Sequence, residues 1–513
     1  MSRTKNSLKN ISVAIVGEIV AVPVGFIARI IFIRILGAEY LGVNGLFTSI
    51  LTMLSLVELG IGPAIIYSLY KPLAEKDTPK VKALMQLYKK AYFLIGTLVL
   101  LLGVLLIPFL HLFVTDTPNV QNLDLIFFLF VLNSAVSYFF AYKRNLIVAD
   151  QQRYIVTFYR FGFFSLVNVL QILFLYLTRS YIDFLLLRIL CTLLENLFVA
   201  RSADKRYPFL KEKTSEKLDR ETIQEIKKNT AAMVTQKIGE IVINATDNIV
   251  ISIKVGTVWV GLYSNYLLVI SALNGILGQF FTAITASVGN LGVTESKERL
   301  LEVFGKIQFA TFWIFGYSGI SLYFLFNPFV RLWVGEDYLL AIDTVLLLAI
   351  LYYIQGMRRA VLTFREALGL YWYDRYKPII QSLVNVLLSL AWAPAYGIAG
   401  VIFATIVSLI AVCFVVEPYF LYKIGFAAPL WTYYTGYARY TVITLAAGYL
   451  TGAVIAQIDG VGLAALAASF AVCLVVPNLV FWLLFHRTQE FRYFKEVLIG
   501  TVRRKRNINS KTS

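Results

Sequence analysis

Long apolar segments, separated by short polar ones, follow one another along almost the whole chain. A helix needs about 20 apolar residues to cross a hydrocarbon core about 30 Å thick. By that measure the sequence predicts fourteen spans, and we expect an all-α polytopic membrane protein. The predicted spans are residues 11–33, 41–67, 91–113, 124–148, 155–178, 181–200, 229–253, 257–287, 304–326, 339–363, 378–396, 398–422, 438–456 and 461–485.

The composition supports this pattern and excludes a soluble domain. Of the 513 residues, 58% are hydrophobic and only 15% are charged, whereas soluble domains carry about 25% charged residues. The N-terminus has the basic start of a signal peptide. However, its apolar run is too long for one, and no small-residue cleavage site follows. We therefore expect an uncleaved first span.

Positive charges are distributed unequally among the predicted loops. Nearly all of the 47 lysines and arginines lie at the N-terminus, in every second loop or in the C-terminal tail. Loops rich in Lys and Arg remain in the cytoplasm, so both termini are predicted to be cytoplasmic. This bias, together with attraction to anionic lipid, accounts for the net charge of +17. The expected partner is therefore the lipid bilayer and not nucleic acid.

The two halves of the chain resemble each other at a shift of 219 residues, which places Gly37 on Gly256 and Gly42 on Gly261. Six spans precede the second copy. Because six is even, both copies have the same orientation, and a pseudo-two-fold axis is expected along the membrane normal. The predicted parts are a six-helix bundle at 1–200, a cytoplasmic linker helix at 201–228, a second six-helix bundle at 229–422, helices 13 and 14 at 423–486, and a basic cytoplasmic tail at 487–513.

Several charged residues fall inside predicted spans. Lys237, Glu240, Asn244 and Asp247 are three, four and three residues apart, which places them in one stripe on a helix. A charge at the centre of a membrane helix costs about 2.5–3.5 kcal/mol or more, so it normally faces the protein interior or a water-filled cavity. The stripe is therefore expected to face a polar interior.

The first half contains comparable residues. Glu18 and Arg29 are eleven residues apart on the first span and share a face. Glu58 lies late in the second span, and Arg188 lies in the sixth. For any one of these residues, a structural hydrogen bond or a snorkelling side chain is the alternative interpretation.

The search for enzymatic chemistry gives no candidate. Cys191, Cys413 and Cys473 lie within spans at spacings that fit no metal site. No nucleotide-binding loop, nucleophile-elbow motif or zinc-protease motif is present. We therefore expect no enzyme activity and no cofactor. Energy for any transport would then come from an ion gradient, with H⁺ or Na⁺ as the coupling ion, or from a partner.

Three stretches resemble the Wzx-type polysaccharide flippases, which transport O-antigen, capsule or exopolysaccharide repeat units. They are FIRILGAEYLGVNGLFTSIL at 32–51, ELGIG with YSLYKPLA at 58–62 and 67–74, and TDNIVIS at 246–252. The resemblance implies a member of the multidrug, oligosaccharidyl-lipid and polysaccharide exporter (MOP) superfamily. Such a protein forms a V-shaped helical bundle in the cytoplasmic (inner) membrane of the cell. It flips an undecaprenyl-pyrophosphate-linked oligosaccharide to the outer leaflet, and it works beside a polysaccharide polymerase and chain-length machinery.

With that cargo, the intramembrane charges take candidate roles. Arg29, Arg188 and Lys237 are expected to bind the pyrophosphate of the substrate. Desolvated carboxylates can change protonation as a cavity opens, so Glu18, Glu58, Glu240 and Asp247 are expected to serve ion coupling or gating. In the repeat alignment Glu18 lies level with Lys237, and Arg29 lies level with Asp247 within one residue. Two oppositely charged pairs are therefore predicted as alternating gates.

Two other functions remain open at this point. A lipid II flippase has the same architecture and a similar cargo. A multidrug or cation antiporter of the same superfamily would usually have twelve spans and a more acidic pocket.

Overall fold

The computed structural model describes residues 3–58, 61–115, 120–212, 218, 220–370 and 373–496. The described residues form helices and connecting segments without a strand. The α-helices are α1 (Arg3–Leu54), α2 (Ile61–Glu75), α3 (Thr78–Leu106), α4 (Leu123–Phe139), α5 (Ala141–Ala149), α6 (Arg153–Thr178), α7 (Tyr181–Arg206), α8 (Arg220–Lys254), α9 (Thr257–Thr294), α10 (Lys297–Trp333), α11 (Ile342–Ala367), α12 (Lys377–Ser408), α13 (Phe414–Phe420), α14 (Trp431–Ile455) and α15 (Leu463–Phe485).

All the predicted spans fall on helices, which confirms the all-α membrane fold. By length and composition, nine helices of the described residues are able to cross a membrane, or up to ten if a bent pair counts as one span. The number is lower than fourteen partly because α1 and α12 each cover two predicted spans, with breaks at Gly37 and Gly397. In addition, α7 and α8 contain several charged residues, so they are not counted among the apolar helices. The orientation of the termini stays a prediction.

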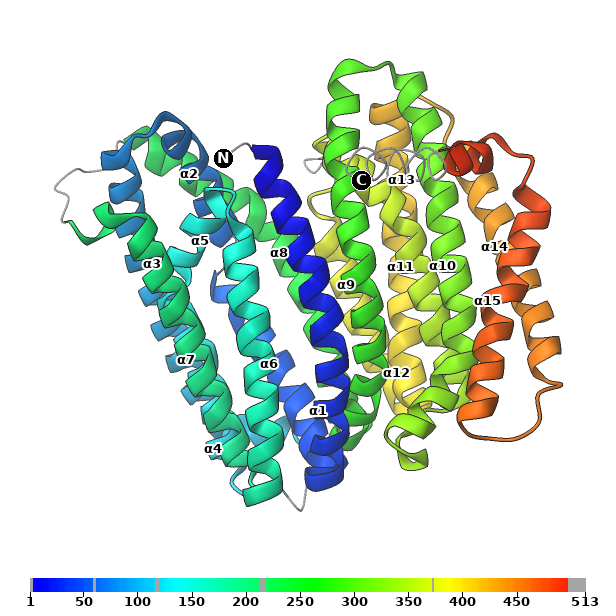
Figure 1. Cartoon of the computed structure of the whole chain (residues 1–513), viewed down its shortest axis with the longest axis horizontal. Helices are drawn as coiled ribbons and strands as arrows, with labels where there is room; N and C mark the ends of the chain where they lie inside the picture. Colours follow the sequence, from blue (N-terminus) through cyan, green and yellow to red (C-terminus); the bar gives the residue numbers. More distant parts are fainter. Residues whose placement is uncertain are drawn as a thin grey trace, which may run out of the picture. The chain divides into compact units, whose positions relative to one another are not determined.

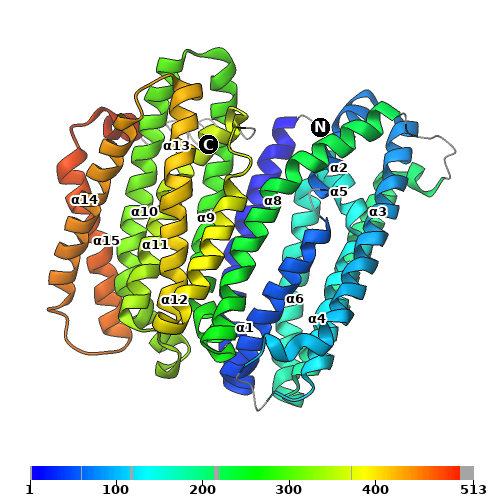
Figure 2. The same cartoon turned by 180° about the vertical axis from the view of Figure 1, so that it is seen from behind.

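The chain divides into two compact units. Unit 1 comprises Met1–Gln279 and Arg375–Ala404. Within it α1 packs along α6, as both views of the cartoon show (Figures 1 and 2), and α1 also contacts α8. At one end, residues of α2, α3, α5 and α7 enclose a core that includes Tyr88 and Tyr92, each 1% exposed.

The repeat is visible as a reciprocal contact within unit 1. A Cβ on Gly42 would lie 2.0 Å from the carbonyl oxygen of Thr257, and one on Gly261 would lie 2.8 Å from the carbonyl oxygen of Ala38. The predicted shift converts the first contact into the second, as a two-fold axis requires. Gly37 and its counterpart Gly256 also share a positive φ, 86° and 131°, which favours glycine where the chain starts a new helix.

Unit 2 comprises Phe280–Asp374 and Thr405–Ser513. In it α10 packs against α11, α14 and α15. Aromatic side chains fill the contact with the last two helices: the rings of Phe312 and Tyr440 stack at 4.4 Å, and Phe481 lies 4.7 Å from Phe312. The Trp313 indole donates a hydrogen bond to Asn478 at 2.7 Å. The predicted additional helices 13 and 14 are therefore an integral part of unit 2.

The two units differ from the predicted bundles at 1–200 and 229–422. Unit 1 includes α8, because this helix packs on α1, where Asn248 donates a hydrogen bond to Ser49 at 2.9 Å. The predicted linker helix at 201–228 is described only in part. Its described residues belong to the end of α7, a short 3₁₀ turn at Pro208–Lys211 and the start of α8.

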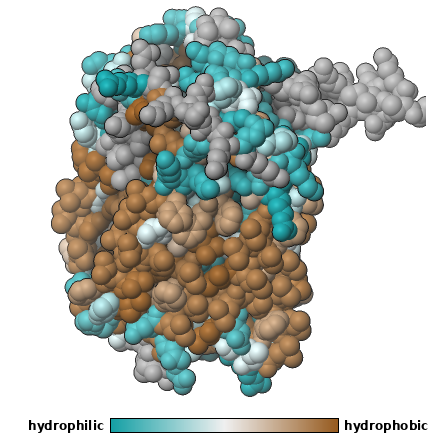
Figure 3. All heavy atoms as spheres, turned by 90° about the vertical axis from the view of Figure 1, so that its left-hand side faces the viewer, coloured by the Kyte–Doolittle hydropathy of each residue, from teal (hydrophilic) through white to brown (hydrophobic). Residues whose placement is uncertain are grey.

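The surface agrees with a membrane environment. Figure 3 shows a broad band of hydrophobic side chains across one face, with hydrophilic side chains above and below it. Large apolar side chains of α3 are exposed, among them Phe93, Leu94 and Leu105 at 63%, 59% and 65%. In water such a surface would aggregate, whereas in a bilayer it is the surface that lipid chains contact. The protein is a multi-pass membrane protein.

Candidate functional site

Arg29 lies on the membrane-spanning part of α1 and points toward α9. Its Nη1 donates a hydrogen bond to the Ser264 hydroxyl at 3.0 Å, and this hydroxyl in turn donates to the Gly261 carbonyl at 2.7 Å. Arg29 also interacts electrostatically with Tyr181, whose side chain is almost completely buried. The neighbours of this guanidinium are therefore hydroxyl groups.

Arg188 lies on α7, and its contacts with the described residues are likewise not to a carboxylate. Its guanidinium carbon is 5.6 Å from the ring centre of Phe130, a cation–π contact. Arg188 also interacts electrostatically with Tyr181, and the Tyr181 hydroxyl donates to Asn44 at 3.3 Å. Tyr181 therefore connects the two arginines, which we call the arginine pair (Arg29 and Arg188).

The arginine pair differs from other partly buried cations of unit 1. Among the described residues, neither Arg29 nor Arg188 forms an ion pair with a carboxylate. By contrast, Arg144 pairs with Glu195 at 2.8 Å, and Lys143 pairs with Asp204 at 2.8 Å. A buried charge is normally paired, so two unneutralised guanidinium groups inside membrane helices are suited to an anionic ligand.

Glu18 lies on the same helix as Arg29 and also faces α9. Its carboxylate oxygens are 3.5–3.6 Å from the position of a Cβ on Gly275. Glu18 and Arg29 are eleven positions apart, as are their neighbours Gly275 and Ser264, so α1 and α9 run antiparallel in register here. The predicted pairs of α1 charges with α8, Glu18–Lys237 and Arg29–Asp247, stay predictions.

Glu58 ends a 3₁₀ turn, Ser55–Glu58, at the end of α1. The hydroxyl of Tyr92 donates to Glu58 Oε1 at 3.1 Å and accepts a hydrogen bond from Asn145 at 3.0 Å. Tyr138 hydrogen-bonds to the same carboxylate. Donors around a carboxylate stabilise its charged form, and a tyrosine hydroxyl oxygen can instead accept a hydrogen bond when Glu58 is protonated.

The charged stripe of α8 is only partly described. The side chains of Lys237, Glu240 and Asn244 lie outside the described residues, although their backbone is helical as predicted. Asp247 interacts electrostatically with Tyr263 of α9, which is 4% exposed. Asp247 therefore faces the interior of unit 1, as the helical stripe predicts.

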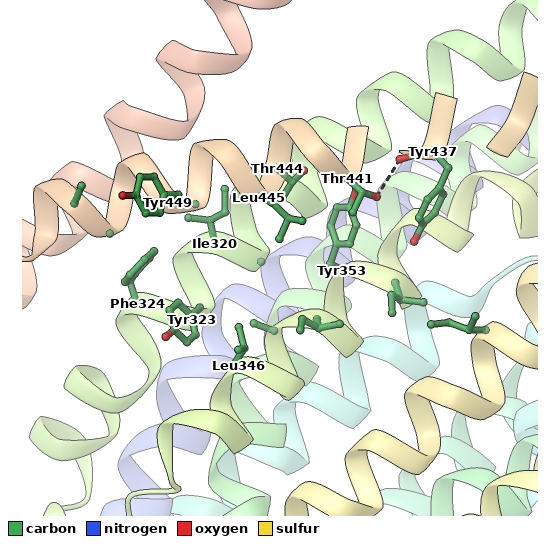
Figure 4. Close-up of a pocket in the computed structure, with 18 of the residues that line it drawn as sticks. Ile320, Tyr323, Phe324, Leu346, Tyr353, Tyr437, Thr441, Thr444, Leu445 and Tyr449 are labelled. Atoms are coloured by element: carbon green, nitrogen blue, oxygen red, sulfur yellow. Dashed lines mark hydrogen bonds between the residues drawn. The ribbon is translucent and has the colours of Figure 1, made fainter. Parts of the chain in front are cut away.

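Unit 2 contains a large apolar cavity of about 800 Å³ between α10, α11 and α14. We call it the apolar cavity; Figure 4 shows Tyr323, Phe324 and Tyr449 at one end and Tyr353 and Tyr437 at the other. On α14 its lining runs from Tyr437 to Ala453, a length of about 24 Å at the helical rise. Tyr449 is 80% exposed, so the cavity is open along the side of the helix.

Four charged residues of unit 2 form a second polar site, the charge cluster (Arg358, Arg365, Asp374 and Glu417). Arg358 donates from Nε and Nη2 to the two oxygens of Glu417, both at 2.6 Å. Arg365 lies 3.5 Å from Glu417 and also pairs with Asp374. The Glu417 side chain is only 1% exposed, so this group is an internal ion network.

Metal and thiol chemistry find no support in the described part of the chain. It contains no group of three His, Cys, Asp or Glu side chains that could hold a metal ion. Cys191, Cys413 and Cys473 are buried free thiols.

A comparison with protein families matches residues 7–285, more than half of the chain, to the family described as polysaccharide biosynthesis protein. The chain belongs to this family. No curated protein matches it significantly.

Several solved structures share the fold of this chain, and two of those named below are described as transporters of the MOP superfamily. Lipid II flippase MurJ in an inward closed conformation has a TM-score of 0.68 at 16% identity, covering 92% of this chain and 98% of its own. A multidrug resistance MATE family transporter in an inward-facing conformation has a TM-score of 0.60 at 14% identity, covering 84% and 98%. A MOP superfamily transporter from Pyrococcus furiosus has a TM-score of 0.52 at 15% identity, and the match covers 86% of this chain and 96% of that transporter.

In this polysaccharide biosynthesis family member, the charge cluster was not among the predicted site residues. The predicted span 339–363 ends before Arg365, whereas α11 continues to Ala367 and places both Arg358 and Arg365 inside unit 2. The available signal was Glu417, a carboxylate within the otherwise apolar predicted span 398–422. A charge in a span requires a partner, and here the partner comes from another helix.

Proposed function

We propose that the protein flips undecaprenyl-pyrophosphate-linked oligosaccharide repeat units from the cytoplasmic to the outer leaflet of the cell (inner) membrane. The arginine pair is the observation that carries this proposal. Two intramembrane guanidinium groups without a carboxylate partner among the described residues offer charge and several N–H donors to an anion. A pyrophosphate attached to a membrane lipid is such an anion. Membership of a polysaccharide biosynthesis family supports the oligosaccharide part of the cargo.

The apolar cavity supports a lipid substrate with a long chain. Its length of about 24 Å exceeds half of a hydrocarbon core about 30 Å thick. An acyl chain of an ordinary phospholipid occupies one leaflet, whereas a polyprenyl chain is longer. An open apolar cavity inside a membrane protein does not stay empty, because its walls gain dispersion contacts with any chain that enters.

Transport by alternating access without ATP would require coupling to H⁺ or Na⁺. Glu58 is a suitable carrier in the described structure, because its tyrosine and asparagine partners can reorient when it is protonated. Glu18, Glu240 and Asp247 are the other candidates. Amide variants of the four residues, tested singly, should include at least one that changes the pH or sodium dependence of transport. Coupling lies elsewhere if all four keep both dependences.

The two gate pairs are tested by charge exchange. Reversing Arg29 or Asp247 alone should abolish transport, and exchanging the two should restore part of it. Cysteines introduced at 29 and 247 should cross-link only in the inward-open state, and those at 18 and 237 only in the outward-open state. Failure of the exchange, with both pairs cross-linking in one state, would leave Arg29 with a cargo-binding role alone.

Reconstitution tests the main proposal directly. The purified protein is placed in liposomes that contain a lipid-linked oligosaccharide, and a membrane-impermeant lectin or glycosidase reports the fraction exposed outside. We expect exposure to increase with the protein present and without ATP. The Arg29→Gln variant should lose this increase. Transport by the isolated chain that depends on ATP would overturn the proposal.

The fold similarity to lipid II flippase MurJ makes lipid II the second candidate cargo. Both cargoes are polyprenyl pyrophosphates, so the arginine pair fits either. Liposomes that contain lipid II or the oligosaccharide lipid, measured side by side, separate the two functions. The antiporter alternative predicts movement of a soluble cation and no lipid exposure.

A further inference from the structure

Burying the charge cluster of unit 2 costs desolvation free energy, which suggests a role beyond stability. Glu417, Arg365 and Asp374 have side chains that are 1%, 5% and 3% exposed. Buried ion pairs are often no more stable than apolar residues of similar volume, because desolvation offsets their attraction. Stability alone is therefore a weak reason to place two arginines and two carboxylates here.

The helix that carries Glu417 is irregular on both sides of it. The short α13 lies between two π-helical turns, Leu409–Cys413 and Leu421–Phe426. Pro418 follows Glu417 and lacks the N–H of a regular helix. Such π-helical turns occur frequently at functional sites, so the backbone independently marks this position.

Arg358 has N–H groups that remain available. Its Nε and one Nη2 hydrogen bind Glu417, and a guanidinium carries five N–H donors in total. Its Nη1 makes no hydrogen bond to the described part of the chain. Arg358 is 24% exposed, whereas Glu417 is 1% exposed. The arginine is thus the accessible member of the pair, held in place by a buried carboxylate.

Arg358 also lies beside the apolar cavity. It lines a small cavity together with Glu417 and Tyr433. Ile354, Phe414 and Tyr437 line both this small cavity and the large one. At the shared end, the Tyr353 and Thr441 hydroxyls are 3.2 Å apart, and Figure 4 shows the same hydroxyls and Tyr437 at one end of the cavity. A long apolar cavity that ends at hydroxyls, with the Arg358 guanidinium in the adjoining small cavity, matches an amphiphile with an anionic head.

We propose that Arg358 binds the diphosphate head of a polyprenyl lipid whose chain occupies the apolar cavity. Glu417 positions the guanidinium and competes with the diphosphate for it. Arg365, which already lies 3.5 Å from Glu417, neutralises this carboxylate when Arg358 turns toward the ligand. The inference rests on the proposed function and adds a second anion-binding residue, in unit 2, to the arginine pair of unit 1.

Binding of geranylgeranyl diphosphate to the full-length protein in detergent tests this assignment. All proteins in the test carry Arg29→Gln, which removes one anion site of unit 1. Adding Arg358→Gln should weaken binding at least tenfold, the loss expected for a charge-assisted hydrogen bond. Adding Glu417→Gln, which keeps one acceptor oxygen but no charge, should strengthen binding. Inorganic pyrophosphate, which lacks the chain, should bind more weakly than the lipid.

A purely structural ion pair predicts a different result, because removal of either partner then harms the fold equally. Both single variants would weaken binding, and the double variant Arg358→Gln/Glu417→Gln would restore it. The proposal requires the double variant to bind as poorly as Arg358→Gln. The double variant removes both charges of the Arg358–Glu417 pair, so neither side chain is left as a buried charge without its partner. Its binding therefore distinguishes the two hypotheses even if a single variant does not fold. Wild-type lipid exposure in liposomes is measured in parallel. Its absence overturns the proposed function, whereas normal exposure by Arg358→Gln overturns only this inference.

Discussion

Replacing Arg29 should separate transport from stability. In a typical internal arginine, loss of the guanidinium leaves a buried carboxylate without its partner. Arg29 has a different environment, because its described hydrogen bond goes to the Ser264 hydroxyl. Arg365 provides the contrast within the same chain, because it contacts both Glu417 and Asp374. We therefore compare Arg29→Gln with Arg365→Gln.

The free-energy changes follow from these contacts. Arg29→Gln loses a hydrogen bond to a charged group, about 1.5–3 kcal/mol, but it also removes a membrane charge that costs about 2.5–3.5 kcal/mol. The two terms oppose each other, so the net change in unfolding free energy should stay within about 1–2 kcal/mol. Arg365→Gln removes a cation from beside Asp374, which is 3% exposed, while Glu417 keeps its contact with Arg358. Breaking a buried pair in this way costs about 3–5 kcal/mol.

Thermal unfolding in detergent and lipid exposure in liposomes measure the two properties separately. Arg29→Gln should unfold near the wild-type temperature and expose no lipid-linked oligosaccharide. Arg365→Gln should unfold at a clearly lower temperature. Arg29→Lys is the matched control, since it keeps the charge without the planar fork and should retain part of the transport. The reasoning is refuted if Arg29→Gln transports normally, or if it unfolds as early as Arg365→Gln.

Three further predictions use single contacts. Gly42→Ala should destabilise unit 1 by about 1–3 kcal/mol, because its Cβ would lie 2.0 Å from the Thr257 carbonyl oxygen. The control is Gly305→Ala, which has nothing within 4 Å of its Cβ position and should be neutral or gain about 1 kcal/mol. Equal thermal stabilities of the Gly42→Ala and Gly305→Ala variants would contradict this prediction. Gly448→Trp should fill part of the apolar cavity and slow the flipping of long polyprenyl carriers more than that of short-chain analogues; equal slowing would exclude the cavity as the chain site. Ser264→Ala should reduce transport less than Arg29→Gln in the liposome assay, since the guanidinium remains.

The sequence by itself determined the class of fold. Membrane-spanning helices need long apolar runs that satisfy their own backbone hydrogen bonds, so local composition was sufficient to place them. The repeat was also readable, because Gly37 and Gly256 occupy the one backbone conformation that strongly favours glycine. Arg29, Arg188 and Asp247 stood out for the same local reason, since a charge inside an apolar run is costly wherever its partner lies.

The tertiary structure decided which partner each of these charges meets. The sequence alignment placed Arg29 level with Asp247 on α8, whereas its described hydrogen bond goes to Ser264 on α9. Nothing in the sequence linked Arg358 to Glu417, yet the two form an ion pair across 59 positions of the chain. Periodicity shows which face of a helix is polar. It carries no information on which distant helix packs against that face, because that choice depends on side-chain packing across the whole unit.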